Sequence, residues 1–194
     1  MHTVRPEDPG RWTIDQLHRL PDDGNRYELV GGELFVTPPP SPGHQLISAA
    51  LQQLLVAYVR EQQLGVVMSA PNQLMLGHEQ EEVQPDLMVI PAAAGDIRGS
   101  WRELPRPMLV VEILSPTTSR RDRVAKRHLY MRERIPTYWI VDGETRSIRA
   151  VRPEREDVIA SDSLVWHPDA AAAPLAVDVT ALFREALGAE GSTP

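Results

Sequence analysis

Residues 108–114, MLVVEIL, hold a single ionisable side chain, Glu112, in an otherwise apolar run. Such a run is typical of a central β-strand that is covered on both faces. Moving a carboxylate out of water costs on the order of several kcal/mol unless it is paired, protonated or bound to a metal. Glu112 therefore has two interpretations. It lies at an open strand end or bonds an arginine, or it acts as a metal ligand or general base.

Turn residues and hydrophobic spacing divide the 194 residues into strands and a few helices. Helices are predicted over residues 13–20, 44–62 and 119–134, and a last one after residue 178. Strands are predicted over residues 66–69, 72–76, 83–90, 108–114, 137–141, 147–151 and 157–160, with a hairpin around Gly31 and Gly32. These elements predict one α/β domain, residues 1–194, with a mixed β-sheet flanked by helices and a frayed tail at residues 188–194.

The chain has no cysteine, which excludes a disulfide framework, a thiolate nucleophile and a zinc–thiolate site. Any metal must then be held by Asp, Glu, His or backbone oxygen. Twenty basic and 27 acidic residues give a net charge of −7, so binding to nucleic acid or an anionic membrane would need a local basic patch. Because the chain has neither a long apolar run nor an apolar leader in MHTVRPEDPG, we expect a cytoplasmic protein without a membrane partner.

Asp86 follows a proline at the head of a second apolar strand, DLMVI. Neighbouring strands lie about 4.8 Å apart, so Asp86 and Glu112 can converge on one hard cation if their strands share a sheet. Two carboxylates with water ligands suit Mg²⁺. Because Pro-Asp pairs are also common in turns, Asp86 supports a metal site only together with Glu112.

Lys126 is the only lysine among the 20 basic residues, which suggests that a compact ammonium is needed there. It lies on the helix predicted after the Glu112 strand, and that helix could bring it to the two acids. The helical wheel opposes this placement, because Lys126 lies beyond the edge of the predicted apolar stripe. An exposed lysine paired with Asp122 is therefore the alternative. The stripe consists of Val124, His128, Met131 and Ile135, widened by Ala125 and Leu129.

Five motifs occur in an order that resembles one known family: YELVGGEL, PSPGHQ, PDLMVI, VVEILSPTTS followed by D-x-x-x-K-x-x-x-Y, and TYWIVD. Together they are similar to the Uma-type putative restriction endonuclease family, within the PD-(D/E)XK nuclease superfamily. The resemblance is strongest over residues 27–142. It implies a restriction-endonuclease-like fold and cleavage of DNA phosphodiester bonds that depends on Mg²⁺, with Mn²⁺ as a substitute.

The resemblance also implies roles for individual residues. Asp86 matches the aspartate of the PD element and Glu112 the acid of the (D/E)XK element, with the backbone carbonyl of Ile113 as a further metal ligand. Leu114 stands where the superfamily has its lysine, and Lys126 on the next helix matches the shifted lysine of the Uma-like pattern. Glu28 in YELV matches a further catalytic acid. Residues expected around these groups or in contact with phosphate are His44, Gln73, Asp122, Tyr130, Arg123 and Arg127.

Residues 119–134 hold six arginines and Lys126 against two acids, a local excess of five positive charges, and Arg98, Arg102 and Arg106 precede the Glu112 strand. This basic region is what contact with DNA phosphates requires, although a solvated arginine-rich helix gives the same pattern. The favoured interpretation is a metal-dependent DNA endonuclease that acts as a homodimer, with one site for each strand. The alternatives are a catalytically silent protein of the same fold that binds nucleic acid or a protein, and a nuclease that needs a protein partner.

Overall fold

The computed structural model describes residues 10–77, 80–92, 99–115, 120–168 and 172–189, without the side chains of residues 120–122. The helices are α1 (Ile14–Leu17), α2 (Pro42–Glu61), α3 (Arg120–Arg132), α4 (Val179–Leu187) and the 3-10 helix η2 (Trp101–Glu103). The strands are β1 (Arg26–Val30), β2 (Glu33–Thr37), β3 (Gly65–Ser69), β4 (Leu74–Leu76), β5 (Glu81–Val83), β6 (Leu87–Pro91), β7 (Leu109–Ile113), β8 (Tyr138–Asp142), β9 (Ser147–Val151), β10 (Val158–Ala160), β11 (Ser163–Trp166) and β12 (Leu175–Asp178). No helix in these described ranges is long and apolar enough to cross a membrane.

Six strands form the central sheet in the order β10-β9-β8-β7-β6-β3. β7 pairs with β8 in parallel, whereas the other neighbours in this sheet are antiparallel. A second sheet has the order β2-β1-β5-β4, and β11 pairs with β12. The mixed sheet with its flanking helices confirms the predicted α/β fold class.

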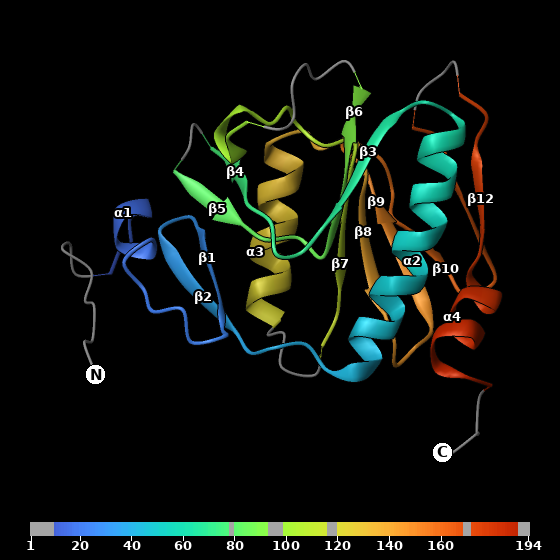
Figure 1. Ribbon diagram of the computed structural model, residues 1–194, viewed down its shortest axis with the longest axis horizontal. Coiled ribbons are helices and arrows are strands. Elements are labelled where there is room, and N and C mark those ends of the chain that lie inside the picture. Colours follow the sequence, from blue (N-terminus) through green and yellow to red (C-terminus); the bar gives the residue numbers. More distant parts are fainter. Residues whose placement is uncertain (1–9, 78–79, 93–98, 116–119, 169–171, 190–194) are drawn as a thin grey trace.

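The two faces of the central sheet are covered by different elements (Figure 1). On one face, α2 and α4 pack with β11 and β12 over an apolar core that includes Leu51 and Trp139. On the other face, α3 and the second sheet cover a core that includes Leu129 and Tyr138. We call these the α2 face and the α3 face.

The side chains of β7 alternate between the two faces. Leu109, Val111 and Ile113 belong to the core on the α2 face, and Val110 belongs to the core on the α3 face. The period of two along a strand therefore places Glu112 on the α3 face, where it is 6% exposed. The predicted central strand and the burial of its carboxylate are both confirmed.

Two strands replace the single strand predicted over residues 83–90. β5 ends at Val83 in the second sheet, and β6 begins at Leu87 in the central sheet. Pro85 lies between them, and a proline has no N–H with which to continue a strand ladder. Asp86 thus lies at the start of β6, where the chain passes from one sheet to the other.

The sequence predicts no strands over residues 163–166 and 175–178, where β11 and β12 form an antiparallel pair. Each has only four residues, too few for a clear alternating pattern. The helix predicted over residues 13–20 is shorter in the structure: Thr13 caps α1, which ends at Leu17. Ser119, where the third helix is predicted to begin, and residues 190–194 of the predicted tail lie outside the described residues.

The apolar stripe predicted for α3 is wrong at two positions. Val124 is 46% exposed and His128 is exposed as well, whereas Lys126 and Tyr130 are buried beside Leu129. Hydrophobic periodicity counts only apolar side chains, so it gives no weight to polar residues that find partners on the sheet. The helix is rotated toward those partners.

Candidate functional site

Four ionisable side chains from four parts of the chain converge on the α3 face. Glu28 comes from β1, Asp86 from the start of β6, Glu112 from β7 and Lys126 from α3, and all four are buried. The strand register brings the acids together: Leu87 pairs with Val111, so Asp86 lies opposite Glu112 one position further along. We call Glu28, Asp86 and Glu112 the carboxylate cluster.

Lys126 bridges two members of the cluster. Its Nζ lies 2.8 Å from Glu28 Oε2 and 3.1 Å from Glu112 Oε1. The side chain is 4% exposed, so the alternative of an exposed lysine is wrong. The side chain of Asp122, its proposed partner in that alternative, lies outside the described residues.

Glu112 also accepts a hydrogen bond from the hydroxyl of buried Tyr130, at 2.8 Å from Oε1. Burial raises the pKa of Glu112 from 4.5 to about 7, although the charge of Lys126 acts in the opposite direction. Burial likewise raises the pKa of Tyr130 well above its usual value, and the nearby charge of Glu112 adds to the shift. The hydroxyl of Tyr130 therefore stays protonated and donates to Glu112 at neutral pH.

Asp86 is held by three donors. The Ile113 N–H donates to Oδ2 at 2.7 Å, Arg26 Nη1 donates to Oδ1 at 2.9 Å, and His44 Nε2 lies 3.2 Å from Oδ2. Burial alone would raise the pKa of Asp86, but the contacts with His44, Arg26 and Ile113 outweigh it and lower the pKa from 3.8 to about 2. Two neighbouring carboxylates thus differ in basicity, a feature common at catalytic sites.

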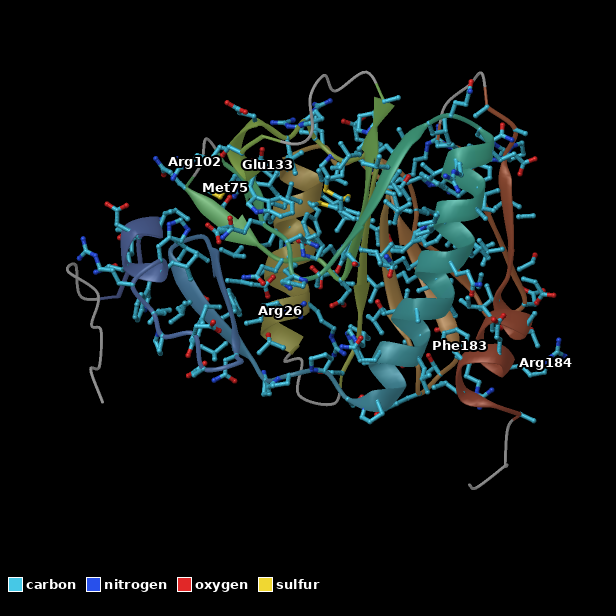
Figure 2. All side chains as sticks on the ribbon, in the orientation of Figure 1. Arg26, Met75, Arg102, Glu133, Phe183 and Arg184 are labelled. Carbon is cyan, nitrogen blue, oxygen red and sulfur yellow. The ribbon has the colours of Figure 1, made fainter. Side chains whose placement is uncertain are left out.

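Arg26 belongs to the site although the sequence analysis did not select it. It begins β1 beside α3 (Figure 2), and its Nη1 also donates to the Gln84 carbonyl at 2.9 Å. Its Nε lies 3.8 Å from Glu28 Oε2. Burial would lower the pKa of Arg26, but the charges of the carboxylate cluster raise it above its usual value. The one sequence signal is its position two residues before Glu28, which places both on the same side of a strand.

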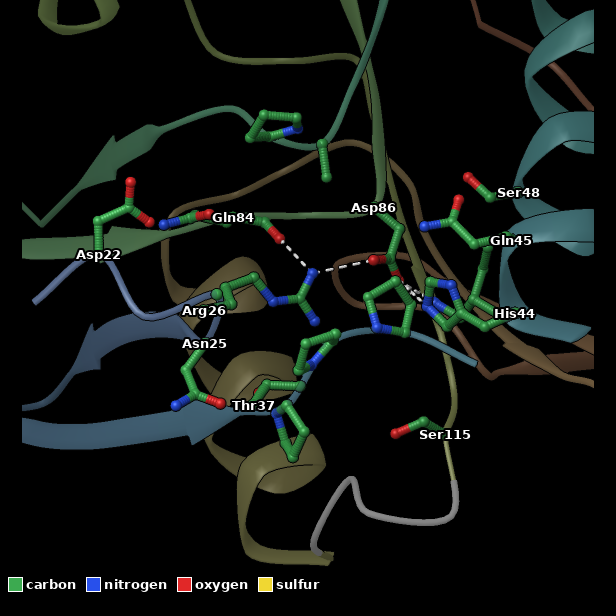
Figure 3. A pocket seen from close by; sticks show the side chains of 17 residues that line it. Asp22, Asn25, Arg26, Thr37, His44, Gln45, Ser48, Gln84, Asp86 and Ser115 are labelled. Atoms are coloured by element: carbon green, nitrogen blue, oxygen red, sulfur yellow. Dashed lines mark hydrogen bonds and ion pairs between the residues drawn. The ribbon is translucent and has the colours of Figure 1, made fainter. Parts of the chain in front are cut away.

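A pocket of about 430 Å³ opens beside Asp86 (Figure 3). Of the carboxylate cluster, only Asp86 lines the pocket in the described part of the chain. A ligand would thus approach the cluster from the Asp86 side. The lining residues that carry polar groups near Asp86 are Arg26, His44, Gln84 and Ser115, and the walls include prolines 38–40, Ala70 and Pro71.

The donor atoms near Asp86 match the chemistry of a hard divalent cation. Mg²⁺ binds through one or two carboxylates and keeps several water ligands. Asp86 and Glu112 supply two such carboxylates, and Ile113, whose N–H donates to Asp86, carries the backbone carbonyl predicted as a further ligand. No group of three or more His, Cys, Asp or Glu in the described residues has the geometry of a metal site. With only two carboxylates, Asp86 and Glu112, water would have to supply most of the remaining ligands of such a cation.

The remaining predicted residues lie at different distances from the carboxylate cluster. His44 and Tyr130 contact the cluster directly. Arg127 instead forms a bidentate ion pair with Asp157, at 2.7 and 2.9 Å. Arg123 lines surface depressions next to the pocket, and Gln73 precedes β4 without a hydrogen bond to the cluster in the described part of the chain. Six of the predicted residues come together in the structure: Glu28, Asp86, Glu112, Lys126, His44 and Tyr130.

Comparison with known proteins identifies similarities in family and fold. The family model described as "Uma2: Putative restriction endonuclease" matches residues 14–179. No curated protein matches the sequence. The structure is similar to the crystal structure of a putative nuclease belonging to DUF820 from Anabaena variabilis ATCC 29413, with a TM-score of 0.77 and 19% sequence identity. The match covers 91% of this chain and 99% of the other, and at this identity it shows the fold alone.

Proposed function

Because the chain belongs to the Uma2 family of putative restriction endonucleases, we propose that it hydrolyses DNA phosphodiester bonds beside Asp86 with the help of Mg²⁺. The observation that carries the proposal is the position of Asp86 directly opposite Glu112, with a buried lysine at hydrogen-bond distance from Glu112. Burying three acids and two cations together costs free energy that an apolar core would not. Ionisable groups buried at such a cost are typical of catalytic sites.

Asp86, Glu112 and the Ile113 carbonyl are the groups that would hold the cation. When bound, Mg²⁺ would polarise the phosphate and lower the pKa of a water ligand. Mn²⁺, which takes similar oxygen ligands, would substitute for it. The cluster carries three carboxylates against Arg26 and Lys126, so a further positive charge at Asp86 and Glu112 is electrostatically favourable.

The side chains around the cation site position and neutralise the reacting groups. Lys126 Nζ, held between Glu28 and Glu112, would orient the attacking water and offset negative charge on the phosphate in the transition state. Tyr130 fixes Glu112 through its hydroxyl, and His44 fixes Asp86 on the pocket side. Glu28 holds Lys126 in place, while its other oxygen accepts from the Gln84 N–H at 2.7 Å. We further propose that two copies act together, so that each strand of a duplex meets one site.

The direct test is cleavage of supercoiled plasmid and of single-stranded DNA by pure protein in Mg²⁺, Mn²⁺ or EDTA. Glu112→Gln and Lys126→Met should abolish cleavage, because each removes a group at the reacting centre. Glu61→Gln, on the exposed surface of α2, is the matched control and should cleave like the wild type. Equal cleavage by all four proteins would point to a contaminating nuclease.

A catalytically silent nucleic-acid-binding protein is the second candidate. The observation in its favour is that Arg26 and Lys126 already neutralise much of the charge of the carboxylate cluster without a metal. This candidate predicts no cleavage by the wild type with either cation. Loss of cleavage in Glu112→Gln alone would keep the nuclease and remove Lys126 from the reaction.

A further inference from the structure

Two connected depressions lie on the outer side of α3, away from the carboxylate cluster. The first has a volume of about 770 Å³ and lies between α3 and the open face of β8, β9 and β10. The second, of about 530 Å³, lies between the last turns of α3 and the chain that follows β9. Arg127 lines both. We call the two depressions together the arginine groove.

Arginines dominate the lining of this groove. Arg123, Arg127 and Arg149 line the first depression, and Arg127, Arg132, Arg134, Arg152 and Arg155 line the second. The only acids among the lining residues in the described part of the chain are Asp142 and Glu154. Seven arginines against two acids are a concentration of positive charge in a chain whose net charge is −7.

Ion pairs compensate only part of this charge. Arg127 and Arg149 pair with Asp157, and Arg132 pairs with Glu81 and Glu133; these three acids lie outside the lining. Arg134 lies 3.9 Å from Glu154, and both side chains are largely exposed, so this pair is weak. Arg152 Nε is buried without a hydrogen-bond partner among the described residues. Arg134 and Arg155 are exposed, so the second depression presents their guanidinium groups to an anion.

The groove and the pocket beside Asp86 border one common depression. This depression, of about 430 Å³, is lined by Arg123, Leu114 and the acids Asp142 and Glu144, and it shares Arg123, Leu114 and Asp142 with the first part of the groove. The same depression is lined by His44 and Ser115, which also line the pocket. A chain-like ligand could thus run from the pocket across the start of α3 and along its outer side.

We propose that the arginine groove binds the phosphate backbone of the nucleic acid strand that extends from the reacting phosphate, an inference that rests on the proposed function. From Arg123 to Arg132 the helix spans roughly 14 Å, long enough to contact more than one phosphate of a strand. The apolar side chains of Val124, Ile140 and Ile159 lie between the arginines and can contact sugar rings. Backbone contacts of this kind position a strand without selecting its sequence.

A second copy of this chain fits the arginine groove less well than a nucleic acid strand does. In a twofold dimer the same patch meets itself, so the arginines of one copy would face those of the other. Like charges brought together in this way repel. The exposed apolar side chains of Val124 and Ile159 would by themselves have suggested such an interface.

The test is binding of a fluorescein-labelled 20-nucleotide single strand in EDTA, followed by anisotropy at several salt concentrations. Arg134→Gln/Arg155→Gln removes two exposed charges from the groove. Arg60→Gln/Arg184→Gln removes two exposed charges from α2 and α4, on the other side of the sheet (Figure 2). Both double variants have the same net charge, so they separate a local effect from a global one. Thermal unfolding of each variant checks that it folds.

The groove variant should bind at least about tenfold more weakly than the wild type, and the slope of log K against log salt should fall by about 1.4, for two lost phosphate contacts. The control variant should stay within about twofold of the wild type. Arg123→Gln, in the connecting part of the groove, should also weaken binding. Equal weakening in both double variants, or no binding by the wild type, would overturn the inference.

Cleavage by the same proteins separates this inference from the proposed function. Glu112→Gln should lose cleavage and keep its affinity for the strand. If the wild type cleaves and the groove variant binds normally, the inference fails and the nuclease stands. If the wild type binds through the groove and never cleaves with Mg²⁺ or Mn²⁺, the proposed function fails and the groove remains a nucleic-acid-binding surface.

Discussion

The two faces of the central sheet are built from the same strands and each has an apolar core, but the α3 face also buries the carboxylate cluster. On the α2 face, β7 contributes Val111 to an apolar core. On the α3 face, the next residue, Glu112, meets Lys126 and Tyr130. Because side chains alternate along a strand, one sheet can stabilise the fold on one side and hold charged groups on the other.

The difference concerns what each face contributes. Burial of apolar surface stabilises the α2 face in proportion to its area. The carboxylate cluster loses hydration that its ion pairs only partly replace, so it contributes little to stability while both partners are present. The α2 face therefore serves stability alone, whereas the α3 face combines an apolar core with the charged groups of the proposed reaction. Each prediction below tests one of the two faces.

Lys126→Met should give the largest effect, because it leaves Glu28 and Glu112 buried without their shared cation. Breaking a buried ion pair on one side costs about 3–5 kcal/mol of unfolding free energy, and cleavage should be lost as well. Urea unfolding and the plasmid assay measure the two effects. The double variant Lys126→Met/Glu112→Gln should recover part of the stability but no activity. Full activity in Lys126→Met would contradict its place in the reaction.

Leu51→Ala tests the opposite face, since Leu51 is fully buried on α2. A leucine-to-alanine change in a core costs about 2–5 kcal/mol. Cleavage per folded molecule should remain at the wild-type level under conditions where the variant is folded. A loss of activity without a loss of stability would show that the two faces are not separate.

Tyr130→Phe removes the hydroxyl that donates to Glu112 and leaves the ring in the core of the α3 face. At pH 8, where Glu112 is ionised, loss of a hydrogen bond to its charged carboxylate costs about 1.5–3 kcal/mol. Cleavage should fall but not vanish, because Lys126 still contacts Glu112. Guanidinium unfolding and initial cleavage rates check both expectations. An unchanged melting curve would mean that the hydrogen bond does not form in solution.

Arg127→Gln should give the smallest effect. Arg127 pairs with Asp157 on the outer side of α3, where its side chain is 39% exposed. Ion pairs at such positions contribute about 0.2–1 kcal/mol. Differential scanning calorimetry at low and high salt should show a small loss in the melting temperature that shrinks as salt rises. A loss as large as that of Lys126→Met would remove the contrast between the inner and outer sides of α3.

Much of the sheet and part of the site can be predicted from the sequence. The apolar run around Glu112 predicts a buried strand with a buried acid, and the structure has both. The positions of Asp86 and Lys126 follow from ordered motifs and from the presence of a single lysine. Hydrophobic spacing alone points the wrong way for Lys126, because a wheel cannot foresee that a polar side chain will find partners on a sheet.

Arg26 shows what local patterns cannot predict. In a chain with 19 arginines, one more at the start of a strand carries no signal in composition. Its importance comes from contacts with Gln84 and Asp86, about 60 residues away in the sequence. Such contacts depend on how the second sheet packs against the central one. β11 and β12 could not be predicted from local sequence for a related reason. Each strand is stabilised by pairing with the other and not by the propensity of its own residues.

The raised pKa of Glu112 makes the stability of the α3 face depend on pH. The folded protein binds this proton up to a pH of about 7, whereas the unfolded chain releases it near 4.5. The stability gained from the protonated form is therefore complete below about pH 4.5 and is lost as the pH rises through 7. Asp86 has the opposite dependence on pH. The stability that its ionised form contributes is present above its usual pKa of 3.8 and is lost as the pH falls toward 2.

Glu112→Gln gives the most direct test of the claim that the α3 face holds a charged site at the expense of stability. The unfolding free energies of the wild type and the variant would be measured in EDTA at pH 5 and pH 8, together with cleavage in Mg²⁺. We expect the variant to gain stability relative to the wild type between pH 5 and pH 8, and to be inactive at both. A variant that cleaves DNA, or that becomes less stable than the wild type as the pH rises, would contradict the account.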